Sequence, residues 1–203
     1  MPFRRRRGNK LTKRVKKVMQ EVAYSTQETK HHRVEDEIDF STSGILVELN
    51  TVDSQGSASG QFIGQEIRQI GLRLRGKLSQ ADANNTVRMV VFTPSAAFET
   101  ALAGGAPPTD LFYAPTNWSA MRECNVKKSY LDTNMTLNIA SGQNDKIRLV
   151  NRWIGLKMKK YKVVEGSVPV SGSDKIYLLL LSDSSLPSHP QFEFASTLYY
   201  KDA

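Results

Sequence analysis

Apolar and polar residues alternate at every second position through much of the chain from about residue 34 onward. This alternation is clearest over residues 69–78 and returns over 131–139 and 192–201. A period of two is that of a half-buried β-strand, because successive side chains of a strand point to opposite faces of its sheet. Two short, predominantly apolar runs, at 87–92 and 176–181, are typical of strands buried on both faces. The alternation predicts a chain built mainly from β-strands.

Together these patterns predict eight strands. A phase slip at Lys159 and Lys160 predicts a β-bulge in the sixth. Since no long helical pattern separates any two strands, the sequence excludes a parallel βαβ sheet and leaves an antiparallel sandwich or barrel. The predicted strands cover residues 34–40, 44–51, 66–79, 86–93, 127–139, 147–163, 175–182 and 192–201.

A long connection between the fourth and fifth predicted strands, residues 94–125, contains Gly-Gly and Pro-Pro pairs and several aromatic residues. Its length indicates a surface insertion with contacts of its own. Its aromatic residues fit two uses equally well, as anchors between subunits or as caps on the ends of the sandwich. These residues are Phe98, Phe112, Tyr113 and Trp118.

Positive charge is concentrated at the start of the chain. Residues 1–33 hold 11 Lys/Arg against two acids, a net charge of +9, whereas residues 34–203 hold 17 Lys/Arg against 18 acids, a net charge of −1. We therefore divide the chain into a basic N-terminal arm, residues 1–33, and one β domain, residues 34–203. Such an arm suits a polyanionic partner held by a tether better than it suits a catalytic cleft.

The first 17 residues of the arm carry nine basic side chains and no acid, so we expect their beginning to be disordered. Apolar residues at helical spacing predict a short basic amphipathic helix near residues 11–23. This helix could instead pack on the domain, and its lack of Trp or Phe makes binding to membranes or calmodulin less favoured. The candidate nucleic-acid-binding residues are Arg4, Arg5, Arg6, Arg7, Lys10, Lys13, Arg14, Lys16 and Lys17.

Residue types that carry metal or cofactor chemistry are scarce. The chain has one cysteine, Cys124, and three histidines, which exclude an intramolecular disulfide and a cysteine-based zinc site. The acids of residues 35–37 could bind Ca²⁺ at a subunit seam, but a solvated strand edge is the favoured interpretation. We expect no metal and no cofactor.

Catalytic motifs are also scarce. Asp183 and His189 with a nearby serine could supply a hydrolase triad, but they stand in a Ser/Pro-rich loop without a nucleophile elbow. The glycines of residues 56–64 match neither G-x-G-x-x-G nor G-x-x-x-x-G-K-S/T, the two glycine-rich motifs that bind phosphate. We expect no enzymatic activity.

The sequence also predicts a location for the protein. No apolar run approaches the roughly 20 residues needed to span a bilayer, and no apolar h-region of a signal peptide follows the N-terminal arginines. We expect a protein without a membrane partner, made and kept in the cytosol or nucleus. Its basic cluster is also typical of a nuclear localisation signal, which a nuclear import receptor would bind.

Several segments, taken in their order and spacing, point to a family. They are the Arg-rich start, Ile63–Arg68 leading into Leu72–Leu78, Asn85–Phe92, Lys128–Asp132 before Met135–Leu137, Lys157–Tyr161, Ile176–Asp183 and Leu198–Asp202. In these segments nearly the whole chain resembles the single jelly-roll capsid proteins of small circular single-stranded DNA viruses, the CRESS-DNA group. More distantly it is similar to the coat proteins of satellite plant viruses.

The resemblance implies an eight-stranded antiparallel jelly-roll sandwich, 60 copies of which close a T=1 icosahedral shell around a single-stranded genome. It implies DNA rather than RNA as the cargo, other copies of the chain as partners, and a location in the virion and in the host nucleus or cytoplasm during assembly. The competing hypothesis is a cellular or viral non-structural nucleic-acid-binding protein with a β-sandwich domain. The lysines of residues 157–162 are a further candidate basic strip, although alternation divides them between two faces.

Overall fold

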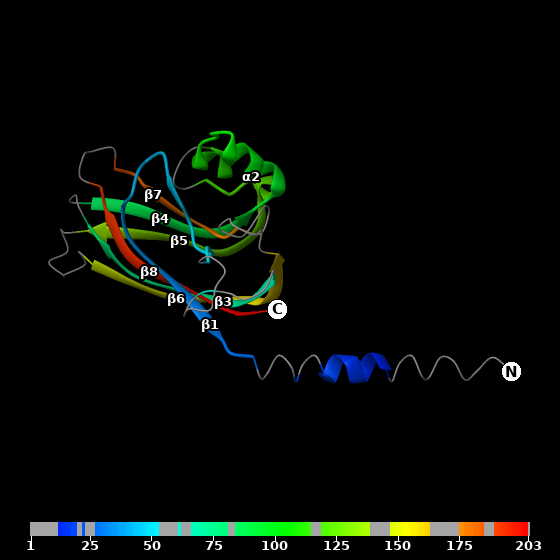
Figure 1. The fold of residues 1–203 in the computed structure, drawn as a ribbon. Coiled ribbons are helices and arrows are strands. Elements are labelled where there is room, and N and C mark those ends of the chain that lie inside the picture. The colour runs from blue at the N-terminus through cyan, green and yellow to red at the C-terminus, as the bar shows by residue number, and fades with distance from the viewer. Residues whose placement is uncertain are drawn as a thin grey trace.

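A computed structural model of the chain describes residues 12–19, 22, 27–52, 61, 66–80, 84–114, 119–138, 147–162, 175–184 and 189–202. The described residues form two four-stranded sheets that face each other (Figure 1). In spatial order, the first sheet contains β1 (Lys30–Asp39), β8 (Gln191–Asp202), β3 (Glu66–Ser79) and β6 (Ile147–Lys162). The second contains β2 (Ile45–Glu48), β7 (Tyr177–Ser182), β4 (Asn84–Pro94) and β5 (Val126–Asn138).

Every pairing within the two sheets is antiparallel. The chain crosses between the sheets at every step except the one from β4 to β5. Eight strands wound in this way make a jelly roll. The structure therefore confirms the predicted all-β fold, and β3 spans the same residues as its predicted strand. The predicted first strand was too short, since β1 begins four residues earlier, at Lys30.

The space between the sheets holds the main hydrophobic core. Alternate residues of each strand point into it, among them Leu72 and Leu74 of β3 and Phe192 of β8. Val87 and Val91 of β4 also point into this core. Val90 and Phe92, which flank Val91 in the strand, lie in a second cluster on the outer face of the sheet. This explains why β4 is apolar on consecutive positions: both of its faces are buried.

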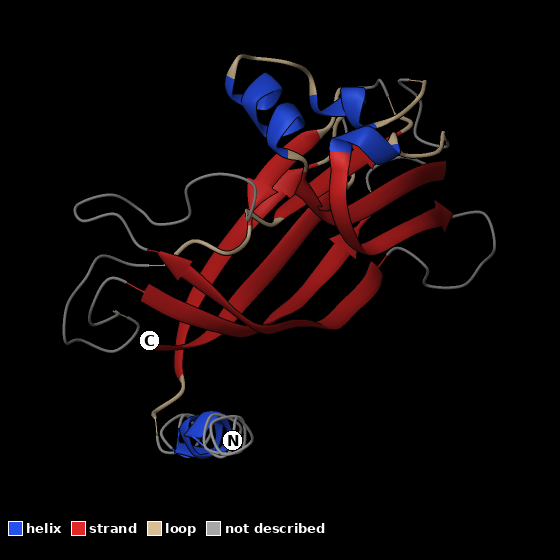
Figure 2. Ribbon diagram, turned by 90° about the vertical axis from the view of Figure 1, so that its right-hand side faces the viewer, coloured by secondary structure: helices blue, strands red, loops and turns tan. Residues whose placement is uncertain are grey.

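The insertion between β4 and β5 forms the second cluster by covering the outer face of the second sheet. It contains α2 (Ala96–Ala103) and the 3₁₀ turns η1 (Pro108–Leu111) and η2 (Glu123–Asn125), gathered at one side of the sandwich (Figure 2). Phe98 and Phe112 are buried against Val90 and Phe92. These two aromatic residues therefore pack on the sheet, and of the other two candidates Tyr113 is exposed and Trp118 lies outside the described residues.

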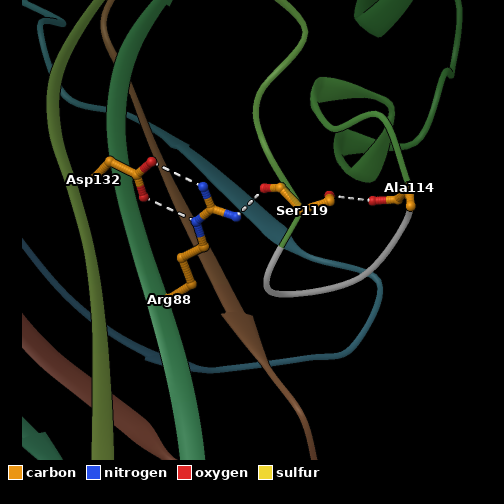
Figure 3. A network of polar contacts seen from close by, with 4 residues as sticks. All are labelled: Arg88, Ala114, Ser119 and Asp132. Atoms are coloured by element: carbon orange, nitrogen blue, oxygen red, sulfur yellow. Dashed lines mark hydrogen bonds and ion pairs between the residues drawn. The ribbon is translucent and has the colours of Figure 1, made fainter.

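A buried arginine fixes this insertion to the sheet (Figure 3). Arg88 of β4 donates from Nε and Nη2 to both carboxylate oxygens of Asp132 on β5, at 2.9 and 2.8 Å. It also donates from Nη1 to the backbone oxygen of Ser119, at 2.6 Å, and its guanidinium lies 4.5 Å from the centre of the Phe112 ring. The Ser119 hydroxyl in turn donates to the backbone oxygen of Ala114. One side chain thus joins two strands and two points of the insertion.

The bulge predicted in the sixth strand is present. Between Gln69 and Gly71 of β3 lies one residue, whereas three residues of β6 lie between their partners Lys159 and Gly155. Lys157, the middle of the three, has a φ of 53°, a left-handed conformation that a single residue of a bulge can adopt. The irregularity lies two to three residues before the predicted position.

Candidate nucleic-acid interface

Part of the basic arm is described as a helix, residues 12–19, which the predicted helix of residues 11–23 contains. Four predicted binding residues, Lys13, Arg14, Lys16 and Lys17, are exposed on it. Val18 and Met19 of the apolar stripe are also 56% and 66% exposed, so this helix does not pack on the sandwich (Figure 1). The remaining candidates, Arg4, Arg5, Arg6, Arg7 and Lys10, and the predicted disordered start lie outside the described residues.

Within the described ranges, no helix is long and apolar enough to cross a membrane. Those ranges also hold no group of three or more His, Cys, Asp or Glu residues suited to a metal ion. Asp183, a residue of the rejected hydrolase triad, has a structural contact: its carboxylate accepts a hydrogen bond from the backbone nitrogen of Thr86, at 2.9 Å.

The arm joins the sandwich through β1, and β1 forms one edge of the first sheet. The outer face of this sheet is left open by the described helices, since α2, η1 and η2 lie with the second sheet (Figures 1 and 2). Its side chains therefore form the surface nearest the origin of the arm.

Strand register divides the charges of this open face between two ends. Glu37 of β1 lies opposite Glu193 of β8, and with Glu35 they border a depression of about 540 Å³ that Arg33, Arg75 and Lys77 also line. Arg33 lies two residues before Glu35 on β1. It is opposite Thr197 of β8, which pairs on its other side with Arg73 of β3. One end of the open face thus carries charges of both signs, and the other is basic.

The basic end is the end at which the arm arrives. The first two residues of β1 are Lys30 and His31, and His31 pairs with Tyr199 one row beyond Arg33. A second depression, of about 220 Å³, is lined by residues of β1, β8 and β3. We name this end of the face the basic-aromatic patch, and its members are His31, Arg33, Arg73, Arg75, Trp153 and Tyr199.

Charge counting along the chain did not find this patch. His31 and Arg33 fall within residues 1–33, the predicted arm, and Arg73 and Arg75 fall on the polar side of the alternation over residues 69–78. The alternation that places Arg73 and Arg75 on the polar face was the available signal, but the pairing of β3 with β8 is not local in sequence. Of the candidate lysine strip, Lys157 is exposed, and the side chains of residues 158–162 lie outside the description.

The comparisons with known proteins add no family to this geometry: no family model matches the chain, and no curated protein matches it either.

Proposed function

We propose that this protein is a viral capsid protein that assembles with copies of itself into a small icosahedral shell and packages a single-stranded genome through its basic arm. The observation that carries the proposal is the separation of charge from fold. A net charge of +9 lies in residues 1–17, while the jelly roll, which begins at Lys30 and has its own core, has a net charge of +1.

Phosphate neutralisation by Lys and Arg releases counterions and requires no particular base-reading geometry. The exposed side chains of Lys13, Arg14, Lys16 and Lys17 suit this mode of binding. Sixty such arms would carry about 540 positive charges, and their multivalency would hold a genome tightly even where one arm binds weakly. DNA is the proposed cargo, a T=1 shell of 60 copies the proposed assembly, and the virion and host nucleus the proposed locations.

The shell itself would form through the sandwich. A jelly roll buries its strand edges in closed sheets or in contacts with neighbours. β6 forms an edge of the first sheet, and its first residue, Ile147, is 48% exposed and available for contacts between subunits. No enzymatic step is part of the proposal.

Sedimentation and electron microscopy of the purified protein test assembly directly. We expect closed shells of uniform size, and small oligomers alone would favour the non-assembling nucleic-acid-binding protein. In a separate binding assay, the logarithm of affinity for single strands should fall with the logarithm of salt concentration with a slope of about −6 if all nine basic residues of the first 17 contact phosphates. A salt-insensitive, sequence-selective complex would contradict the arm mechanism.

A further inference from the structure

Three aromatic rings stand in a row across the basic-aromatic patch. The rings of His31 on β1 and Tyr199 on β8 have centroids 6.4 Å apart, and the rings of Tyr199 and Trp153 on β6 have centroids 5.4 Å apart. Trp153 is 57% exposed. At this exposure, much of the surface of the indole ring is open to a stacking partner from outside the chain.

The sheet has a specific gap that holds Trp153 in this row. β3 lies between β6 and β8, and the residue of β3 paired with Tyr199 is Gly71. A Cβ atom at Gly71 would lie 2.3 Å from Cζ2 of Trp153, a distance that no real contact allows. Because glycine is there, the indole crosses β3 and reaches Tyr199.

Arginines flank the row of rings. Arg73 pairs with Trp153 in the register of β3 and β6. Together with Arg33 and Arg75, it lines the depression of about 220 Å³ in the patch. Arg33 forms an exposed ion pair with Glu35. Arg73 and Arg75 make no hydrogen bond or ion pair with any other described residue, so their donors are available to an external anion.

Exposed aromatic faces beside arginines are the combination that binds single-stranded nucleic acid, since bases stack on the rings and guanidinium groups contact phosphates. A duplex hides the base faces and cannot use the rings in this way. We propose that the basic-aromatic patch is a second binding site for single-stranded nucleic acid, where at least one base stacks on Trp153. The proposal rests on the proposed function for its cargo, and it adds base stacking to the phosphate contacts of the arm.

Fluorescence of Trp153 gives a direct readout. The chain has two tryptophans, so Trp118→Phe in the full chain leaves Trp153 as the sole emitter. At protein concentrations below the onset of assembly, we expect a 20-nucleotide oligo-dT to quench this emission and an abasic 20-mer of the same charge to leave it unchanged. Trp153→Ala, made in the unsubstituted chain, should weaken oligo-dT binding about tenfold, the loss of one stacked base, and leave abasic binding unaltered.

Two variants make the test specific. Trp153→Phe keeps a ring and should retain most of the affinity, and it covers the case in which Trp153→Ala fails to fold. Leu149→Ala is the matched control, because Leu149 is 83% exposed on the same strand and lies on the same face, opposite Lys77. Its oligo-dT affinity should equal that of the parent.

The outcomes separate this proposal from the proposed function. If Trp153→Ala binds oligo-dT like the parent while neutralisation of the arm abolishes binding, the stacking site is wrong and the arm mechanism stands. If arm neutralisation leaves affinity unchanged, the arm mechanism fails. If Trp153→Ala abolishes assembly with oligo-dT affinity intact, the patch is a contact between copies and the stacking proposal is overturned.

Discussion

Arg88 and Asp132 form a pair whose two members are buried to different extents. Arg88 is 5% exposed and Asp132 is 32% exposed, so water can reach the carboxylate if the arginine is removed but cannot easily reach the guanidinium if the carboxylate is removed. An uncompensated buried charge is strongly destabilising. Removal of Asp132 should therefore destabilise the fold more than removal of Arg88.

We expect Asp132→Ala to lower the free energy of unfolding by about 3 kcal/mol and Arg88→Met to lower it by less, because methionine leaves no buried charge. Urea denaturation measures both values. Arg33→Ala is the control, since the Arg33–Glu35 pair is 60% and 64% exposed and such pairs contribute at most about 1 kcal/mol. Equal losses for Asp132→Ala and Arg33→Ala would contradict the role given to the buried pair.

Gly71 matters through the ring that lies over it. Gly71→Ala places a methyl group where the Trp153 indole now lies, so the indole must move off β3 and further into solvent. We expect red-shifted Trp153 emission in the Trp118→Phe background and weaker binding of oligo-dT, although every ring and every arginine is still present. Unchanged emission and affinity would show that the position of Trp153 does not depend on this gap.

At the level of strands and helices, the sequence predicted most of the strands in which apolar and polar residues alternate. β3 matches its predicted range because Leu72, Leu74 and Leu78 are buried and the residues between them are not. β1 was predicted to start late because residues 30–33 are all polar, and only pairing with β8 makes them a strand. α2 was missed because its eight residues are too few to show a helical period, although Ser95, whose hydroxyl accepts from the backbone nitrogen of Phe98, was a local signal for its start.

The candidate nucleic-acid interface also has one part that the sequence predicts and one part that it does not. The basic residues of the arm are contiguous in the chain, so a charge count finds them. Tyr199, Gly71 and Trp153 are brought together only by the pairing of three strands. No period or spacing in the sequence specifies which strands become neighbours, so their meeting could not be predicted from it.

The junction of β2 and β7 contains two groups that hold their protons more tightly in the folded chain. Lys175 lies 3.2 Å from Glu48, Nζ to Oε2; burial acts to lower the pKa of Lys175, but the Glu48 carboxylate raises it overall. Burial raises the pKa of Tyr177 above its ordinary 10.0. For a raised pKa, the contribution to stability is complete below the ordinary value and is lost as pH rises through the folded value.

We therefore expect the free energy of unfolding to fall as pH rises above about 10, and to fall less steeply in Tyr177→Phe, which has no proton to lose. Urea denaturation at a series of alkaline pH values measures both slopes. Tyr113→Phe, at an exposed tyrosine, is the control and should keep the slope of the parent. An unchanged slope in Tyr177→Phe would show that burial of this phenol does not contribute to the alkaline loss of stability.

For the whole molecule, we propose that two parts of the chain perform two different tasks. The sandwich supplies a folded, nearly neutral body whose core lies between its sheets, and the arm supplies cationic charge; the part of it described as a helix, residues 12–19, has no residue in that core. Replacing the nine basic residues of the first 17 by glutamine should therefore leave stability unchanged within about 0.5 kcal/mol while removing most of the affinity for polyanions.

The most direct test of this account is the nucleic-acid content of assembled particles, measured by the ratio of absorbance at 260 and 280 nm on shells counted by electron microscopy. The parent chain should yield closed shells that contain single-stranded nucleic acid, and the glutamine variant should yield folded protein whose shells, where they form, are empty. Particles of the variant that contain as much nucleic acid as those of the parent would contradict the central claim. So would a parent chain that stays monomeric in every buffer.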